Sequence, residues 1–258
     1  MSNSDDKGAD PNLTAEAIVR RRLEGERLQI EEEFDRGGMG RIERATDRHL
    51  SRTVARKVLD TRLRHETKSV RYFLREACIT ARLAHPAIVP VHELGVDREG
   101  RLFFTMKLVE GKTLGEMVRE AEQAGPPTGE RLFELLTAIV RVCDALALAH
   151  SCGIYHRDLK PENVMIGRFG AVYLMDWGVA ACDAEKVSLP DELLLEEGRS
   201  AVGTPAYMAP EQALGEQPDA RTDVFGVGGL LYYTLTRRAP HRGETVMAVL
   251  QKAAYEAV

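Results

Sequence analysis

The most informative part of this 258-residue chain reads His156-Arg157-Asp158-Leu159-Lys160-Pro161-Glu162-Asn163. A lysine follows the aspartate by two positions, and an asparagine follows it by five. On one constrained turn, a carboxylate, an ammonium group and an amide at this spacing can converge on a phosphate group and its metal ion. The alternative is a surface turn that ends at a proline, but a pattern of eight residues argues against it.

These eight residues match the catalytic loop of the eukaryotic-type protein kinases in full, and the chain resembles that family, in particular its bacterial Ser/Thr members. The resemblance implies an α+β fold of two lobes, a small β-rich N-terminal lobe with one helix and a larger helical C-terminal lobe. It implies that Asp158 accepts the proton of the substrate hydroxyl, that Lys160 neutralises charge on the transferred phosphoryl group and that Asn163 ligates Mg²⁺. ATP and Mg²⁺ are the expected cofactors. Ser and Thr hydroxyls of proteins, its own included, are the expected acceptors.

A lysine and a glutamate occur in the order that the family keeps. Lys57 follows Val-Ala-Arg on the third predicted strand, and Glu76 lies in the predicted helix 67–83. A lone lysine or glutamate is usually plain surface charge. Together, and by resemblance, these two are expected to form the ion pair that places the lysine on the α- and β-phosphates of ATP.

The triplet Asp176-Trp177-Gly178 stands where the family has Asp-Phe-Gly, 18 residues after Asp158. Asp176 is therefore expected to ligate the Mg²⁺ that bridges the β- and γ-phosphates. Trp177 departs from the family but keeps a large apolar ring. It is expected to pack under the helix that carries Glu76.

The glycine-rich turn at residues 35–42 is the weakest match to the family, because Asp35 stands where the family has its first glycine. Glycine lets backbone N–H groups approach phosphates. A carboxylate that pointed inward would repel ATP, so the Asp35 side chain is expected to point to solvent. A plain hairpin explains this turn by itself equally well.

By resemblance, adenine lies between Ile42 and Ala55 on one side and Met165 on the other. The expected ATP-binding residues are Phe34, Gly37, Gly38, Gly40, Ile42, Ala55, Lys57, Met106, Lys107, Val109 and Met165.

Residues 203–211 read Gly-Thr-Pro-Ala-Tyr-Met-Ala-Pro-Glu and resemble the substrate-docking loop of the family. Small-molecule phosphotransferases lack such a segment, so it favours a protein substrate, and Thr204 in it favours Ser or Thr acceptors. Arg157 beside the catalytic aspartate is expected to bind a phosphorylated residue, with Ser200 as the candidate phosphosite. Asp223 is expected to accept backbone hydrogen bonds from the catalytic loop.

Composition and charge restrict the class of protein. The chain carries 35 Lys and Arg against 40 Asp and Glu, a formal net charge of −5. Nucleic-acid modules usually show a basic excess, so nucleic acid is not an expected partner. The most apolar stretch, residues 224–233, is far shorter than the ~20 residues of a membrane helix, and no membrane segment is expected within the chain. Four cysteines without a CxxC pair and the absence of a secretory signal predict a cytoplasmic protein.

The chain divides into a tail and one domain. Residues 1–27 are expected to be a flexible tail that holds a short basic helix. Residues 28–258 are expected to be a kinase domain, with an N-lobe at 28–106, a hinge at 107–111 and a C-lobe at 112–258. Extended runs predict strands at 28–34, 41–45, 53–59, 85–95, 101–109, 163–167 and 171–175, and apolar periodicity predicts helices at 67–83, 130–150, 223–236 and from 243 onward.

The last helices of the family's larger lobe are missing from the chain. Helix 223–236 is apolar nearly all round, as expected at the centre of a lobe. Without those last helices it is expected to be exposed, and Glu211 is expected to lack its partner. Two other functions remain open. One is a pseudokinase or scaffold with little turnover, motivated by Asp35, Trp177, Ala181 and the missing helices, and the other is a kinase of small metabolites. A dimer of kinase domains is a further expected state.

Overall fold

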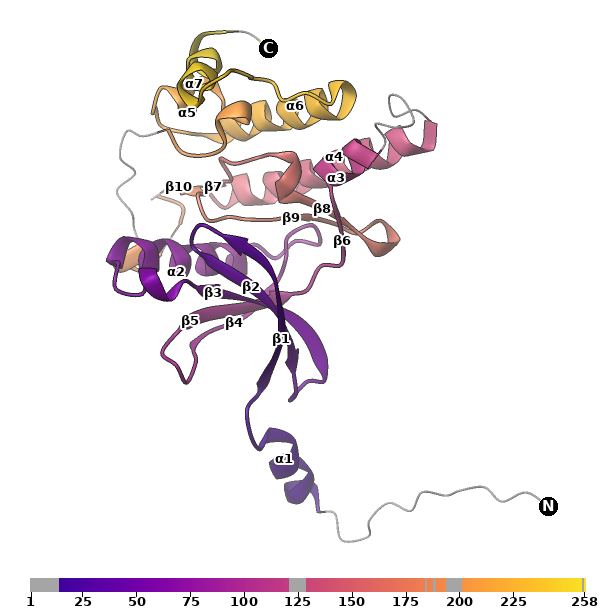
Figure 1. The fold of residues 1–258 in the computed structure, drawn as a ribbon, viewed down its shortest axis with the longest axis vertical. Helices are drawn as coiled ribbons and strands as arrows, with labels where there is room; N and C mark the ends of the chain where they lie inside the picture. Colours follow the sequence, from indigo (N-terminus) through magenta and orange to yellow (C-terminus); the bar gives the residue numbers. More distant parts are fainter. Residues whose placement is uncertain (1–13, 121–128, 184, 188, 194–200, 257) are drawn as a thin grey trace, which may run out of the picture.

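The computed structural model describes residues 14–120, 129–183, 185–187, 189–193, 201–256 and 258. Figure 1 shows two lobes, a lower one built around a sheet and an upper one built mainly of helices. This arrangement confirms the α+β, two-lobed fold that the sequence predicts. The candidate Ser200 phosphosite lies outside the described residues.

The N-terminal lobe contains a five-stranded antiparallel sheet in the order β1-β2-β3-β5-β4. One helix, α2, lies between β3 and β4 in the chain, as predicted. Its elements are β1 (Leu28–Gly37), β2 (Gly40–Asp47), β3 (Arg52–Leu59), α2 (Thr67–Arg82), β4 (Val91–Val96) and β5 (Leu102–Lys107), with a short 3₁₀ turn at Thr61–Leu63. The predicted strand at 85–95 begins later than expected, at Val91.

The alternation of side chains along β3 decides what faces α2. Successive residues of a strand point to opposite faces. Ala55 and Leu59 are buried in one apolar cluster with Phe73 and Ala77 of α2. Lys57 lies between them at the same period, so the strand directs it toward α2 and the space between the lobes.

The opposite face of β3 carries a buried guanidinium. Arg56 is 2% exposed, and it bonds Glu43 of β2 and Asp97 beyond β4, both at 2.6 Å. Its guanidinium also lies 4.4 Å from the ring centroid of Phe103. A buried charge is tolerated only when it is paired, and here each carboxylate comes from a different part of the sheet. The network therefore ties β2, β3 and the β4–β5 turn together.

The C-terminal lobe is helical around two small sheets, β6-β8-β9 and β7-β10. Its helices are α3 (Leu114–Glu120), α4 (Gly129–Ser151), α5 (Pro210–Ala213), α6 (Ala220–Thr236) and α7 (Val246–Tyr255). Its strands are β6 (Gly111–Thr113), β7 (Ile154–Tyr155), β8 (Val164–Gly167), β9 (Val172–Leu174) and β10 (Ala181–Cys182), and 3₁₀ turns lie at Pro161–Asn163, Arg168–Gly170, Asp191–Leu193 and Pro205–Tyr207. The buried face of α4 includes the predicted Leu135, Ile139, Val142 and Leu146.

Helix α6 is buried on one face only. Gly226, Leu230 and Tyr233 lie in the interior, whereas Val224 is 66% and Leu235 55% exposed. The expected exposure of this apolar helix is thus found at Val224 and Leu235, while its other face is buried in the lobe. In place of the arginine that Glu211 is expected to lack, the Thr222 hydroxyl donates to its Oε1 at 2.7 Å.

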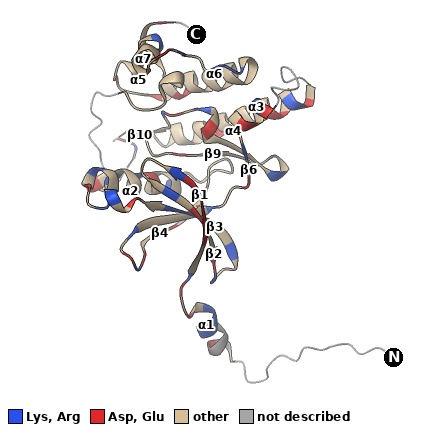
Figure 2. Cartoon of the chain, in the orientation of Figure 1, with Lys and Arg blue, Asp and Glu red and all other residues tan. Residues whose placement is uncertain are grey.

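The region before the first lobe contains the predicted short basic helix, α1 (Ala15–Leu23). Its Arg22 donates to the His49 carbonyl and to the Ser51 hydroxyl in the β2–β3 turn. Basic and acidic residues lie side by side on α2 and α3 (Figure 2). Among the helices of the described residues, none combines the length and the apolar character needed to cross a bilayer.

Candidate active site

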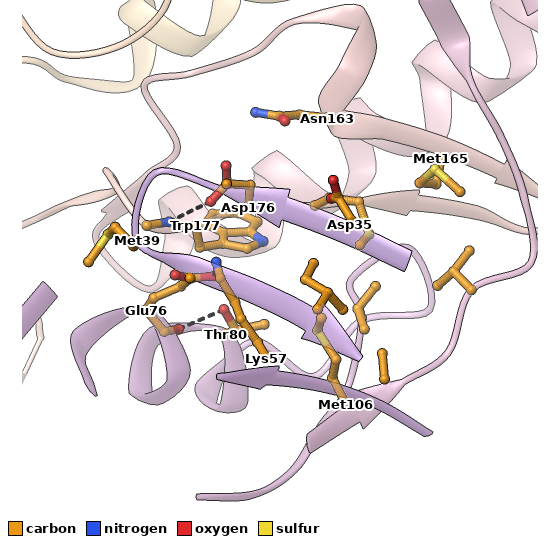
Figure 3. Close-up of a pocket in the computed structure, with 18 of the residues that line it drawn as sticks. Asp35, Met39, Lys57, Glu76, Thr80, Met106, Asn163, Met165, Asp176 and Trp177 are labelled. Atoms are coloured by element: carbon orange, nitrogen blue, oxygen red, sulfur yellow. Dashed lines mark hydrogen bonds and ion pairs between the residues drawn. The ribbon is translucent and has the colours of Figure 1, made fainter. Parts of the chain in front are cut away.

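A cleft of about 580 Å³ lies between the two lobes. Its walls come from β1 to β3, α2, the hinge after β5, β8 and the start of the segment after β9. Each residue that the sequence predicts for ATP binding lines this cleft, and so do Glu76, Asn163 and Asp176. Figure 3 shows Lys57 and Glu76 on the N-lobe side, with Asn163 and Met165 across from them.

One end of the cleft is lined by apolar side chains. Ile42 and Ala55 line it from the sheet, and Met165 lines it from β8. Met106, at the end of β5, is only 8% exposed. Apolar walls beside the backbone of the hinge suit a flat heterocycle.

The predicted ion pair is formed. Lys57 Nζ lies 2.5 Å from Glu76 Oε1. Burial alone would lower the pKa of Lys57, but the carboxylates of Glu76, Asp176 and Asp35 outweigh it and raise that pKa above its ordinary value. The lysine therefore stays an ammonium ion in the cleft, where it can attract phosphate.

Asp158 lies beyond the cleft, where the loop that carries it meets residues 203–211. Its Oδ1 accepts hydrogen bonds from the backbone N–H and the hydroxyl of Thr204, at 2.7 and 2.6 Å. Its Oδ2 lies 2.7 Å from Lys160 Nζ. Burial would raise the pKa of Asp158, but the bonds from Lys160 and Thr204 hold it below its ordinary value. The group is thus an oriented, ionised carboxylate.

Asn163 and Asp176, the two expected metal ligands, both line the cleft. Asn163 Nδ2 donates to the Asp158 carbonyl at 2.8 Å, which fixes the amide and leaves its oxygen for another partner. Asp176 is exposed and has φ +58°, and Figure 3 shows its carboxylate toward Asn163. Among the described residues no three His, Cys, Asp or Glu side chains gather as a metal site. A carboxylate and an amide oxygen still fit Mg²⁺, which binds few protein ligands and takes the rest from water and phosphates.

Asp223 holds the loop that carries Asp158. Its two carboxylate oxygens accept from the backbone N–H groups of His156 and Arg157 at 2.8 and 2.9 Å. Its Oδ2 is also 2.7 Å from His150 Nε2. Asp223 is 1% exposed, so these N–H groups are removed from water. The predicted structural role of Asp223 is confirmed.

Trp177 is fully buried between the lobes. It belongs to the same apolar cluster as Ile79 of α2, in agreement with its predicted packing, and the His156 ring packs edge-on against it at 4.7 Å. Its Nε1–H finds no hydrogen-bond partner among the described residues. The indole thus serves as an apolar filler at this position.

The expected orientation of Asp35 is only partly right. The side chain is exposed, yet it also lines the cleft instead of leaving it. Some lining residues were not anticipated from the sequence, among them Met39, Tyr72, Thr80 and Phe104, whereas Leu108 lies in the predicted hinge. Phe104 lies two residues before Met106 on the same strand, and this two-residue spacing is the signal that could have indicated it.

Comparison with known proteins gives one family and many relatives. The protein kinase domain family matches residues 28–257. The chain is 35% identical over 240 residues to the serine/threonine-protein kinase PknD of Protochlamydia amoebophila, covering 87% of this chain and 24% of that protein. It is 38% identical over 232 residues to a probable serine/threonine-protein kinase of Streptomyces coelicolor, covering 89% and 33%.

A third relative comes from another bacterial group. The chain is 40% identical over 225 residues to the DNA damage-responsive serine/threonine-protein kinase RqkA of Deinococcus radiodurans, covering 86% of this chain and 31% of that protein. The chain therefore spans between a quarter and a third of the length of these relatives.

Proposed function

The chain belongs to the protein kinase domain family, and we propose that it transfers the γ-phosphoryl group of ATP to Ser and Thr hydroxyls of proteins, its own included. One observation carries the proposal. An ionised Asp158, held by Lys160 and by Thr204 of residues 203–211, lies next to a cleft that contains the Lys57–Glu76 pair.

The cleft would bind the nucleotide through groups of known position. Ile42, Ala55 and Met165 would contact the adenine, and the ammonium group of Lys57 would bind the α- and β-phosphates. Asn163 and Asp176 would hold Mg²⁺. When bound, the metal ion supplies positive charge that neutralises the β- and γ-phosphates.

In the transfer itself, a Ser or Thr hydroxyl oxygen forms the new bond to the γ-phosphorus while the bond from that phosphorus to the ADP oxygen breaks. Asp158 orients the hydroxyl and takes its proton. Lys160, 2.7 Å from Asp158, would offset charge on the phosphoryl group in flight. Most of the catalysis in this class of reaction comes from such positioning and charge neutralisation.

Residues 203–211 support a protein acceptor over a small metabolite, because Thr204 places that segment directly against the carboxylate. The proposal also includes the domain limits 28–258 and a cytoplasmic location, where ATP is available. Phosphorylation at Ser200 and a dimer of kinase domains are further parts of the proposal.

The test is transfer of radiolabel from γ-labelled ATP with Mg²⁺ to the chain and to a generic basic protein. Asp158→Asn should lower the rate by about 10²–10⁴-fold, because a positioned base is lost. Lys57→Met should abolish transfer and leave a cooperative melt. Glu216→Gln removes an exposed carboxylate outside the site and should change nothing.

Two results would contradict the proposal. Nucleotide binding without transfer, unchanged by Asp158→Asn, would favour a scaffold. Transfer to a sugar or an amine but to no protein would favour a metabolite kinase.

A further inference from the structure

A carboxylate lines the nucleotide cleft at the place where the family has a glycine. Asp35 lies in β1 opposite Ile42 of β2, next to a β-bulge between Glu33 and Asp35. Its side chain is part of the cleft wall. In Figure 3 its carboxylate lies on the side of the cleft that carries Asn163 and Asp176.

The backbone at Asp35 does not require glycine. Among the described residues, those with positive φ include Asp176 and Arg157 but not Asp35. A side chain is therefore accommodated there without strain, and what it changes in the cleft is the charge.

The negative charge of Asp35 is not neutralised by an ion pair in the described structure. Its Oδ1 accepts from the Arg36 backbone N–H at 2.8 Å. The Arg36 guanidinium instead bonds both carboxylate oxygens of Glu33 at 2.7 Å. No Lys or Arg of the described residues forms an ion pair with Asp35.

The cleft as a whole has an excess of negative charge. Carboxylates of Asp35, Glu76, Glu162 and Asp176 line it, against the ammonium groups of Lys57 and Lys107. Lys57 is already paired with Glu76, and Lys107 donates to the Tyr173 hydroxyl. The charges of Asp35 and Asp176 do interact with Lys57, but among the described residues neither carboxylate forms an ion pair with it, so both still repel an entering triphosphate. Asp176 has a use for its charge as a metal ligand, whereas Asp35 has none in the proposed reaction.

We propose that Asp35 is a specificity-determining residue that makes nucleotide binding conditional on a bound divalent cation. The inference rests on the proposed function, since it concerns the same cleft. Metal-free ATP carries more negative charge than its Mg²⁺ complex, so the carboxylate repels it more strongly. Adenosine carries no phosphate, so its affinity should not depend on the charge of Asp35. The residue thus rejects metal-free nucleotide in favour of the form that can react.

The experiment is titration calorimetry with three ligands: adenosine, ATP with EDTA, and ATP with Mg²⁺. Asp35→Asn removes the charge and keeps the shape, and Asp35→Gly restores the residue of the family. Glu31→Gln is the matched control, because it removes a charge from the same strand outside the cleft, where Glu31 accepts a hydrogen bond from the Thr46 hydroxyl.

Asp35→Asn should increase the affinity for metal-free ATP by about tenfold and that for Mg²⁺–ATP by about two- to threefold, and it should leave the affinity for adenosine unchanged. High salt should reduce the effect on metal-free ATP, because it screens the repulsion. Glu31→Gln should leave all three affinities within about twofold. Equal changes for all three ligands, no change for metal-free ATP, or the same change in Glu31→Gln would overturn the inference. If the wild-type chain binds none of the ligands, the proposed function itself fails and this inference fails with it.

Discussion

Two buried backbone N–H groups in the catalytic loop depend on a single side chain. His156 is 0% exposed, and the N–H groups of His156 and Arg157 both donate to Asp223. A buried donor left without its acceptor costs ~1–3 kcal/mol. Asp223→Ala should therefore lower the free energy of unfolding by roughly 2–5 kcal/mol, measured by urea denaturation, and Asp223→Asn should cost less because one acceptor oxygen remains.

The control for this prediction lies at the start of the same helix. Asp219 is the N-cap of α6 and accepts from the Arg221 N–H in a more exposed place. Its replacement by alanine removes a cap, which costs ~1 kcal/mol. An equal loss in Asp223→Ala and Asp219→Ala would show that the catalytic loop does not depend on Asp223.

The sequence predicted single residues well where their roles depend on order along the chain. The Lys57–Glu76 pair and the role of Asp223 are examples, because both follow from landmarks in sequence. The direction of Asp35 did not follow, because the register shift between Glu33 and Asp35 breaks the two-residue alternation of β1. A bulge is set by pairing with β2, so a period counted on one strand cannot reveal it.

At the scale of elements, the contact of α6 with the catalytic loop depends on one glycine. A Cβ added to Gly226 would lie 2.8 Å from Leu159 Cβ, whereas one added to Gly228 meets nothing within 4 Å. Alanine normally favours a helix over glycine by ~1 kcal/mol. Gly228→Ala should therefore stabilise the chain by up to ~1 kcal/mol, while Gly226→Ala should destabilise it by about 1–3 kcal/mol through overpacking. Thermal or urea unfolding measures both, and stabilisation by both would contradict this packing.

The ion pairs of Asp97 with Arg56 and Arg101 should make the stability of the chain depend on pH. Burial would raise the pKa of Asp97, but bonds from Arg101 and Arg56 lower it from 3.8 to about 2. Since the folded pKa lies below the unfolded one, the stabilisation is complete above about pH 4 and is lost as the pH falls toward 2. Asp97→Asn should lose roughly 1–2 kcal/mol at pH 7, and its difference from wild type should shrink between pH 4 and 2.

The measurement is urea denaturation as a function of pH. Glu99→Gln is the control, because this neighbouring side chain is 69% exposed in the same turn. Its difference from wild type should stay near zero at every pH. A difference between Asp97→Asn and wild type that did not depend on pH would contradict the depressed pKa.

Element types were predictable from local periodicity, but the environment of α6 was not. Its nearly uniform apolar sequence predicts burial all round. In the structure Leu230 is buried and Val224 is exposed, because exposure depends on which neighbours pack against each face. The hydrogen bond of Glu211 was not predictable either, because its partner Thr222 lies at the start of another helix.

At the scale of the whole molecule, the cleft exists only because distant segments meet. Lys57, Met106, Met165 and Asp176 come from four separate parts of the chain and line one space. Their positions were predictable because the resemblance supplied the topology. The hydrogen bond from Thr204 to Asp158, 46 residues away, was not predictable from the sequence, because it depends on how residues 203–211 fold back onto the loop that carries Asp158.

A ligand that contacts both lobes should stabilise the whole domain. At about 100 times its Kd, Mg²⁺–ATP should add ~2.7 kcal/mol, which corresponds to an increase of about 5–10 °C in Tm for a chain of this length. Adenosine at the same ratio should give a similar shift through the apolar end of the cleft. Asp176→Asn removes one metal ligand, so its shift with Mg²⁺–ATP should fall to that with ATP and EDTA, while its adenosine shift persists. Differential scanning fluorimetry measures each of these shifts. An Mg²⁺-dependent shift that survives in Asp176→Asn would show that the cation binds elsewhere, since the proposed site would then lack one of its two protein ligands.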